Sequence, residues 1–179
     1  IMGFSLGGMI VRRFAMDHPD MAQAIAILHS PHDRDQAAHD KIQQRVYQAK
    51  ADGPDATVED ALIRWFSDAF RASRPDIIDD VRQWVKANDR NIYPQIYQVL
   101  VDGVKELIAP ELPINCPALV MTGDEDFGNN PDMSAAIAKE IPASELHILK
   151  GLRHMAMLED PDTFNAVLIR FINKVATHS

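Results

Sequence analysis

The feature that most constrains this chain is Ser5, which lies between two glycines in the pattern Gly-x-Ser-x-Gly over residues 3–7. Residues 1–4 are apolar, and apolar residues recur at helical spacing over 9–16. This pattern predicts a strand end, a tight turn and a helix with almost no loop between them. The turn is strained and crowded, so the side chains two positions either side of the serine must be small. We expect the Ser5 hydroxyl to stand above a sheet edge, near the positive end of the helix.

Strand and helix patterns alternate along much of the remaining chain. Short apolar runs at 24–28, 118–121 and 146–149 are typical of parallel strands. Helical patterns cover 131–140 and 160–175. This alternation predicts an α/β fold, with a parallel sheet and helices on both of its faces.

Residues 35–103 interrupt the alternation with a run of amphipathic segments. We predict four helices there, broken at glycine, proline and polar residues, over 35–51, 58–72, 76–88 and 91–102. The sequence therefore predicts a core made of 1–34 and 104–179, with a helical insert between two of its strands.

A serine hydroxyl needs a base before it can act as a nucleophile, and histidine is the usual one. Among the seven histidines, His154 lies in a loop that follows a strand and precedes the final helix. That position places it over the carboxyl edge of the sheet, where active sites of such sheets lie. His147 falls inside a strand and is expected to be structural. We expect His18, His39 and His178 to lie at the surface.

An acid should orient the imidazole of that base. Three acids, residues 124–126, follow the predicted strand at 118–121 directly. We expect Asp126 to serve, because the turn after Gly123 can aim it inward. Asp124 is the second choice and Glu125 the third.

The chain order is then Ser5, Asp126, His154. Serine, acid and histidine follow one another in this order in α/β hydrolases, whereas chymotrypsin-like and subtilisin-like proteases use other orders. The alternative is a glycine-rich turn with an exposed serine and two unrelated residues. Three candidates, each placed after its own strand, make that coincidence improbable.

The elbow at 3–9, the acidic turn at 123–126, and the segments 151–154 and 158–161 resemble the α/β-hydrolase fold superfamily. The resemblance is closest to its esterases, enol-lactonases and cofactor-free haloperoxidases. It implies Ser5 as nucleophile, Asp126 as acid and His154 as base, and it implies that residues 35–103 form a cap over the pocket. A serine at position 5 disfavours haloalkane dehalogenases and epoxide hydrolases, which have aspartate there.

Members of this superfamily have several strands before the elbow. These N-terminal strands are absent from this chain, so we expect the natural protein to be longer and this chain to be its C-terminal part. The backbone N–H of Leu6, next after the nucleophile, is the expected oxyanion donor. A second donor is expected from the preceding region.

The segment 29–35 is rich in histidine and aspartate and could suggest a metal site. Its spacing matches no standard metal motif, so we predict no metal and no cofactor. His29 follows a strand on the catalytic side, and substrate contact is expected for it. Phe127 and Met155, which neighbour the acid and the base, are the other expected substrate-binding residues.

Composition narrows the class of partner. The formal net charge of −8 disfavours nucleic acid and anionic membranes, since both would repel the chain. Cys116 is the single cysteine, so no internal disulfide can form, as is usual in the cytoplasm. We expect a cytoplasmic protein that acts on a small molecule.

The expected chemistry is hydrolysis of a carboxylic ester or lactone through an acyl-enzyme. Two alternatives stay open: a carbon–carbon bond hydrolase or perhydrolase-like enzyme with the same triad, and a ligand-binding receptor without catalysis.

Overall fold

The computed structural model describes residues 1–177, and the chain divides into two compact units. The first consists of Ile1–His32 together with the chain from Glu106 onward, and it contains the sheet. The second, Asp33–Lys105, contains helices joined by turns and no strand; the helical insert was expected at 35–103. None of the helices in the described part of the chain is long and apolar enough to span a membrane.

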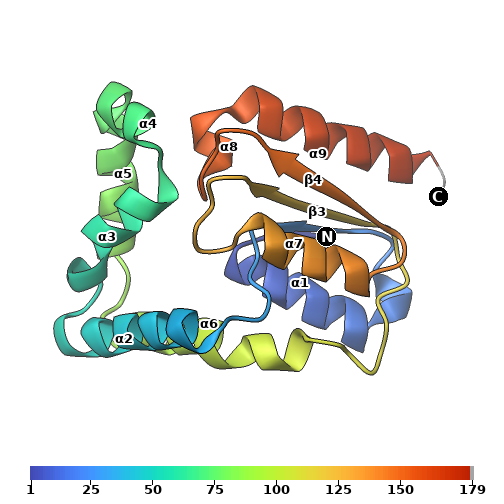
Figure 1. Cartoon of the computed structure of the whole chain (residues 1–179), viewed down its shortest axis with the longest axis horizontal. Helices are drawn as coiled ribbons and strands as arrows, with labels where there is room; N and C mark the ends of the chain where they lie inside the picture. The colour runs from blue at the N-terminus through green and yellow to red at the C-terminus, as the bar shows by residue number, and fades with distance from the viewer. Residues whose placement is uncertain (178–179) are drawn as a thin grey trace. The chain divides into compact units, whose positions relative to one another are not determined.

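The sheet has four parallel strands in sequence order, of which Figure 1 labels the neighbours β3 and β4. They are β1 (Met2–Phe4), β2 (Ile25–Leu28), β3 (Ala118–Gly123) and β4 (Ser144–Leu149). β2 and β3 are buried along their whole length, as their continuous apolar runs predict. Because all four strands run the same way, their carboxyl ends meet at one edge, and the residues that follow them are brought together there.

Helices cover both faces of this sheet, as expected (Figure 1). On one face α1 (Leu6–Asp17) packs on β1 and β2, and α7 (Pro131–Glu140) packs on β3 and β4. The other face is covered by α8 (Ala156–Glu159) and α9 (Pro161–Ala176), and its core contains Ala26, Leu28, Leu119, Met121, Phe164 and Phe171. A 3-10 turn, η1 (Pro19–Met21), follows α1. The expectation of an α/β fold with a parallel sheet is confirmed.

The two long helices after β3, α7 and α9, each begin at a side-chain cap. The Asn130 side chain accepts a hydrogen bond from the Met133 N–H at the start of α7, and the Asp160 side chain accepts one from the Thr163 N–H at the start of α9. A proline occupies the first turn of each helix, where its missing N–H costs nothing. The short helix α8 was not predicted, because four residues carry no helical periodicity.

The helical unit contains five α-helices where four were expected. They are α2 (Gln36–Asp52), α3 (Asp55–Trp65), α4 (Asp68–Ser73), α5 (Pro75–Lys86) and α6 (Tyr93–Asp102), followed by η2 (Gly103–Leu107). The predicted single helix at 58–72 is wrong. Phe66 takes an extended backbone conformation, and the Ser67 hydroxyl accepts a hydrogen bond from the Phe70 N–H, which starts a new helix.

A buried arginine ties together the two places where the chain leaves and re-enters the sheet unit. Arg12 of α1 is 2% exposed and donates to the carbonyls of Pro31, at 3.4 Å, and Leu107, at 2.6 Å. It also forms an ion pair with Glu140 of α7, at 3.1 Å. The second oxygen of Glu140 contacts His32 Nε2, at 3.0 Å. Arg12 and Glu140 together therefore bind the segment before the helical unit, at 31–32, and the segment after it, at Leu107.

Candidate active site

Ser5 occupies the turn between β1 and α1 in a backbone conformation that L-residues rarely adopt, with φ of 54°. Its N–H donates to the Leu28 carbonyl, at 2.8 Å, and its carbonyl accepts from the Gly8 N–H, at 3.0 Å. These bonds anchor both sides of the turn, to β2 and to the first turn of α1. The turn is therefore strained and rigid, as a nucleophile elbow requires.

The glycines around the elbow are crowded in a different pattern from the one predicted. A Cβ at Gly3 would lie 2.0 Å from the carbonyl oxygen of Gly7, so no side chain fits at position 3. At Gly7 a Cβ would meet nothing within 4 Å, so the expected need for a small residue there is wrong. The crowded position in the helix is Gly8, where a Cβ would lie 2.5 Å from that of Ser30.

Asp126 follows β3 and is 1% exposed. Its Oδ1 accepts the backbone N–H groups of Gly128, at 3.1 Å, and Asn129, at 3.0 Å. Of its two acidic neighbours, Asp124 accepts the Gly151 N–H, at 2.7 Å, and Glu125 pairs with Arg153, at 3.5 Å. Asp126 is thus the acid of the three whose carboxylate the structure places against an imidazole.

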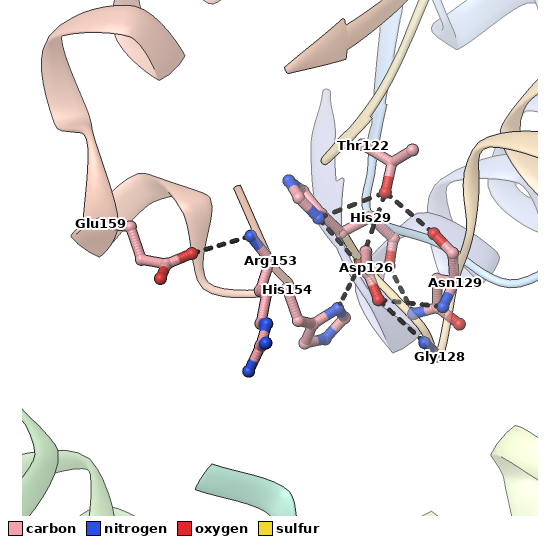
Figure 2. A network of polar contacts seen from close by, with 8 residues as sticks. All are labelled: His29, Thr122, Asp126, Gly128, Asn129, Arg153, His154 and Glu159. Carbon is pink, nitrogen blue, oxygen red and sulfur yellow. Dashed lines mark hydrogen bonds and ion pairs between the residues drawn. The ribbon is translucent and has the colours of Figure 1, made fainter. Parts of the chain in front are cut away.

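His154 lies in the loop between β4 and α8, with its Nδ1 2.7 Å from Oδ2 of Asp126 (Figure 2). Gly123 at the end of β3 allows this loop to pack against the strand, because a Cβ at Gly123 would lie 2.0 Å from the Leu152 carbonyl oxygen. The ring of Phe4, the residue before Ser5, packs on the His154 imidazole with a centroid distance of 4.8 Å. Ser5, Asp126 and His154 therefore lie at the same edge of the sheet.

The electrostatics of the site favour a charged Asp126. Burial alone would raise the pKa of its carboxyl, but the charge of His154 and the hydrogen bonds from His154 and His29 outweigh this, so the pKa lies well below its usual range. The acid therefore stays ionised at neutral pH, where it can hold the Nδ1–H tautomer of His154 and stabilise a positive charge on its ring.

His29 lies elsewhere than expected. Its side chain is completely buried, and its Nδ1 lies 2.9 Å from the same Oδ2 of Asp126 that His154 contacts (Figure 2). Its carbonyl accepts a hydrogen bond from the Asn129 side chain, at 2.7 Å. A group buried behind the acid has no surface to offer a substrate, which corrects the expectation of substrate contact at His29.

Two further residues of this network were missed. Thr122 donates its hydroxyl to the Asn129 carbonyl, at 2.9 Å, and Asn129 binds both Asp126 and His29. The available signal was the spacing Asp-x-x-Asn over 126–129, because a carboxylate that accepts N–H groups two and three positions later is a common loop motif.

The remaining expected site residues lie around this centre. Leu6 is the first residue of α1, where helix N–H groups have no partner inside the helix, so its N–H suits an oxyanion. Met155 precedes α8 and is partly buried. Phe127 is 67% exposed, and the Arg153 guanidinium lies 5.3 Å from its ring centre.

The group His29, Asp126 and His154 is the one set of side chains in residues 1–177 whose donor atoms lie close enough to hold a metal ion. Both imidazoles approach one carboxylate oxygen through Nδ1, at 2.7 and 2.9 Å, which are hydrogen-bond distances that require a proton on each Nδ1. A nitrogen that carries a proton cannot bind a metal. The geometry is therefore that of a hydrogen-bonded network.

Comparison with known proteins places this site in a family. The model of the Hydrolase_4 family, described as serine aminopeptidase S33, matches residues 1–161. A curated relative, the (E)-2-((N-methylformamido)methylene)succinate hydrolase of Acinetobacter baylyi, is 25% identical over 94% of this chain and 62% of its own length. The 3-oxoadipate enol-lactonase 2 of the same organism is 23% identical over 94% of this chain and 63% of its own length.

Solved structures show the same fold. The enol-lactonase of Burkholderia xenovorans LB400 superposes with a TM-score of 0.84 at 21% identity, over 96% of this chain and 64% of its own. A thermophilic esterase superposes with a TM-score of 0.75 at 26% identity, over 97% and 65% of the two chains. The chain thus has the α/β-hydrolase fold and spans less than two thirds of the length of these relatives.

Proposed function

Because the chain belongs to the Hydrolase_4 family (serine aminopeptidase S33) of α/β-fold hydrolases, we propose that it carries the triad of a serine hydrolase that cleaves a carboxylic ester or lactone. The observation that carries this proposal is the buried 2.7 Å contact between Asp126 Oδ2 and His154 Nδ1, at the sheet edge where the Ser5 elbow also ends.

The proposed reaction begins when the Ser5 hydroxyl attacks the substrate carbonyl. His154 accepts the hydroxyl proton and later returns it to the leaving alcohol, while Asp126 holds the ring and stabilises its charge. The Leu6 N–H donates to the developing oxyanion. Water, activated by His154, then attacks the acyl-enzyme and releases the carboxylic acid.

The ester or lactone class is supported by the relatives, which include enol-lactonases and an esterase. We assign substrate contact to Phe127 and Met155, which flank the acid and the base in sequence, and the role of cap to the helical unit 33–105. A small organic substrate fits these roles, and the reaction needs no metal or cofactor.

Active-site labelling tests the proposal. The full-length protein is treated with a fluorophosphonate probe and digested to locate the label, and short-chain aryl esters are assayed in parallel. We expect labelling at Ser5 that is lost in Ser5→Ala and strongly slowed in His154→Ala, together with ester hydrolysis. Labelling that is absent from Ser5, or that is unaffected by His154→Ala, would overturn the proposal.

The same experiment separates the alternatives. Labelling at Ser5 with no hydrolysis of any ester or lactone would contradict the substrate class and leave the triad in place, as in a carbon–carbon bond hydrolase. A properly folded protein whose Ser5 is never labelled would contradict catalysis altogether and fit a receptor.

A further inference from the structure

We propose that His29 is a positioning residue for this reaction: it donates its Nδ1–H to Asp126 and thereby holds the carboxylate that orients His154. This inference rests on the proposed function and adds a fourth side chain to the triad. It follows from four features of the described network.

The first feature is that two imidazoles share one oxygen. Oδ2 of Asp126 lies 2.7 Å from His154 Nδ1 and 2.9 Å from His29 Nδ1, and the two rings meet edge to face with centroids 5.7 Å apart (Figure 2). Such a perpendicular arrangement lets each N–H approach the oxygen along its own direction. Neither imidazole therefore displaces the other.

The second feature is the protonation state that the surroundings impose on His29. Its Nε2 is buried and has no hydrogen-bond partner within residues 1–177. A proton there would be an unsatisfied donor, whereas the contact with Asp126 requires a proton on Nδ1. Burial also lowers the pKa of His29, although the hydrogen bond to Asp126 opposes this. His29 is therefore a neutral Nδ1–H donor.

The third feature is the backbone at His29, which has a φ of 50°. Within residues 1–177, two other non-glycine residues have positive φ, Ser5 and Ala109. Ser5 follows β1 and His29 follows the neighbouring β2, so both lie at the catalytic edge of the sheet. The His29 N–H donates to the Met121 carbonyl, at 2.7 Å, and Asn129 binds its carbonyl, so this unfavourable conformation is held from both sides.

The fourth feature is that Asp126 is saturated with donors. Oδ2 receives the two imidazoles, and Oδ1 receives the N–H groups of Gly128 and Asn129. The Thr122 hydroxyl also lies 3.4 Å from Oδ2, but it is closer to the Asn129 carbonyl, at 2.9 Å. A carboxylate has about four acceptor sites, so all of them are used and the group cannot rotate. Each donor also withdraws negative charge from the carboxylate. The donation from His29 therefore makes Asp126 a weaker partner for a charged His154.

This last point gives the direction of a measurable effect. Without the His29 donor, Asp126 would stabilise the charged form of His154 more strongly, so the acid limb of the kcat/KM profile would move to higher pH. The groups around His29 come from every neighbouring element. Phe4 lies in β1, Thr122 in β3, Asp126 and Asn129 in the loop after β3, His154 in the loop before α8, and Phe164 in α9. The charge of Glu159 in α8 also acts on His29. Asp126, His154 and Glu159 are the titratable groups among them, and Glu159 accepts the Arg153 N–H.

Two variants of the full-length protein isolate the donor. His29→Phe keeps an aromatic ring of similar size and removes the N–H. His29→Asn places an amide N–H near the position of Nδ1, and asparagine tolerates positive φ better than most residues. The readouts are kcat and KM for an aryl ester from pH 5 to 9, the downfield imidazole N–H signals in proton NMR, and the thermal midpoint.

We expect His29→Phe to lower kcat on the order of 10- to 100-fold with little change in KM, because the orienting carboxylate is loosened. The acid limb of its kcat/KM profile should move up by about one pH unit, and one of two downfield N–H signals should disappear. His29→Asn should restore most of kcat and the position of the acid limb.

A purely structural His29 would give a different pattern. A lower thermal midpoint in His29→Phe, with kcat per labelled site and the acid limb unchanged, would overturn the inference. The inference would also be overturned if His29→Asn showed the same kcat and the same acid limb as His29→Phe. If the unaltered protein is not labelled at Ser5, the proposed function itself fails, and the NMR signals alone then report whether His29 donates to Asp126.

Discussion

Oδ2 of Asp126 lies 2.7 Å from Nδ1 of His154, and both side chains are buried within the sheet unit. The contact joins a loop that follows β3 to a loop that follows β4, so it depends on the register of two neighbouring strands. Because the acid is held by backbone N–H groups on its other oxygen, the histidine is oriented by a group that is itself fixed.

Asp126→Asn should lower kcat for an aryl ester by on the order of 10³- to 10⁴-fold, because an amide cannot accept the imidazole N–H groups on one atom and the backbone N–H groups on the other, and it favours the wrong tautomer of His154. Asp124→Asn is the matched control, since the Asp124 carboxylate accepts the Gly151 N–H and contacts no imidazole within residues 1–177. Steady-state kinetics of the two variants checks this. Equal losses in both would contradict the assignment of Asp126 as the acid.

Gly3→Ala should disrupt the elbow, because its Cβ would lie 2.0 Å from a backbone oxygen that cannot move without breaking α1. We expect a loss of at least about 2 kcal/mol in the free energy of unfolding, with loss of fluorophosphonate labelling. Gly7→Ala adds the same methyl group into open space and should change stability by less than about 1 kcal/mol. Chemical denaturation of both variants distinguishes crowding from a general effect of alanine, and a stable, labelled Gly3→Ala would refute the crowding argument.

Arg12→Met should cost about 3–5 kcal/mol in the free energy of unfolding, because it leaves Glu140 and two buried carbonyls without their donor. The exposed pair of Arg13 and Asp17 on the same helix provides the control, and Arg13→Met should have little effect. Urea titration of both variants measures the difference. Similar stabilities for the two would show that the buried network contributes nothing.

Acid should destabilise the protein through His29. The pKa of this residue is below its ordinary value of 6.5 in the folded state, so below about pH 6.5 the unfolded chain binds a proton that the folded chain does not. Stability then falls as pH falls, by up to about 1.4 kcal/mol per pH unit for this one proton, until the folded-state pKa is reached. The free energy of unfolding of His29→Asn should fall less steeply from pH 6.5 to 5. An unchanged slope would contradict a neutral His29 in the folded state.

The sequence predicted those parts of the fold and site that depend on local pattern. The tight turn at Ser5 could be predicted because the glycine spacing, the strand and the helix adjoin one another, and the loop position of His154 because it follows a strand and precedes a helix. Preferring Asp126 to Asp124 needed only the direction of one turn, and the structure pairs Asp126 with the imidazole.

The missed features depend on contacts that sequence spacing does not encode. His29 and Asp126 are 97 positions apart, and only the strand register brings them together. The break before Ser67 had a local signal, a serine at a helix start, but the helical periodicity on both sides of it masked the signal. Gly8 was overlooked because its crowding comes from Ser30 on the neighbouring segment.

The contacts of Arg12 have a consequence for how this architecture can diversify. The guanidinium holds the carbonyls of Pro31 and Leu107 together, although the whole helical unit separates them in the sequence. The chain therefore leaves and rejoins the sheet unit at neighbouring points. A replacement segment would need only to bridge the short distance between these two points. We therefore expect that residues 33–105 can be exchanged for another helical segment without moving Ser5, Asp126 and His154, which all lie in the sheet unit.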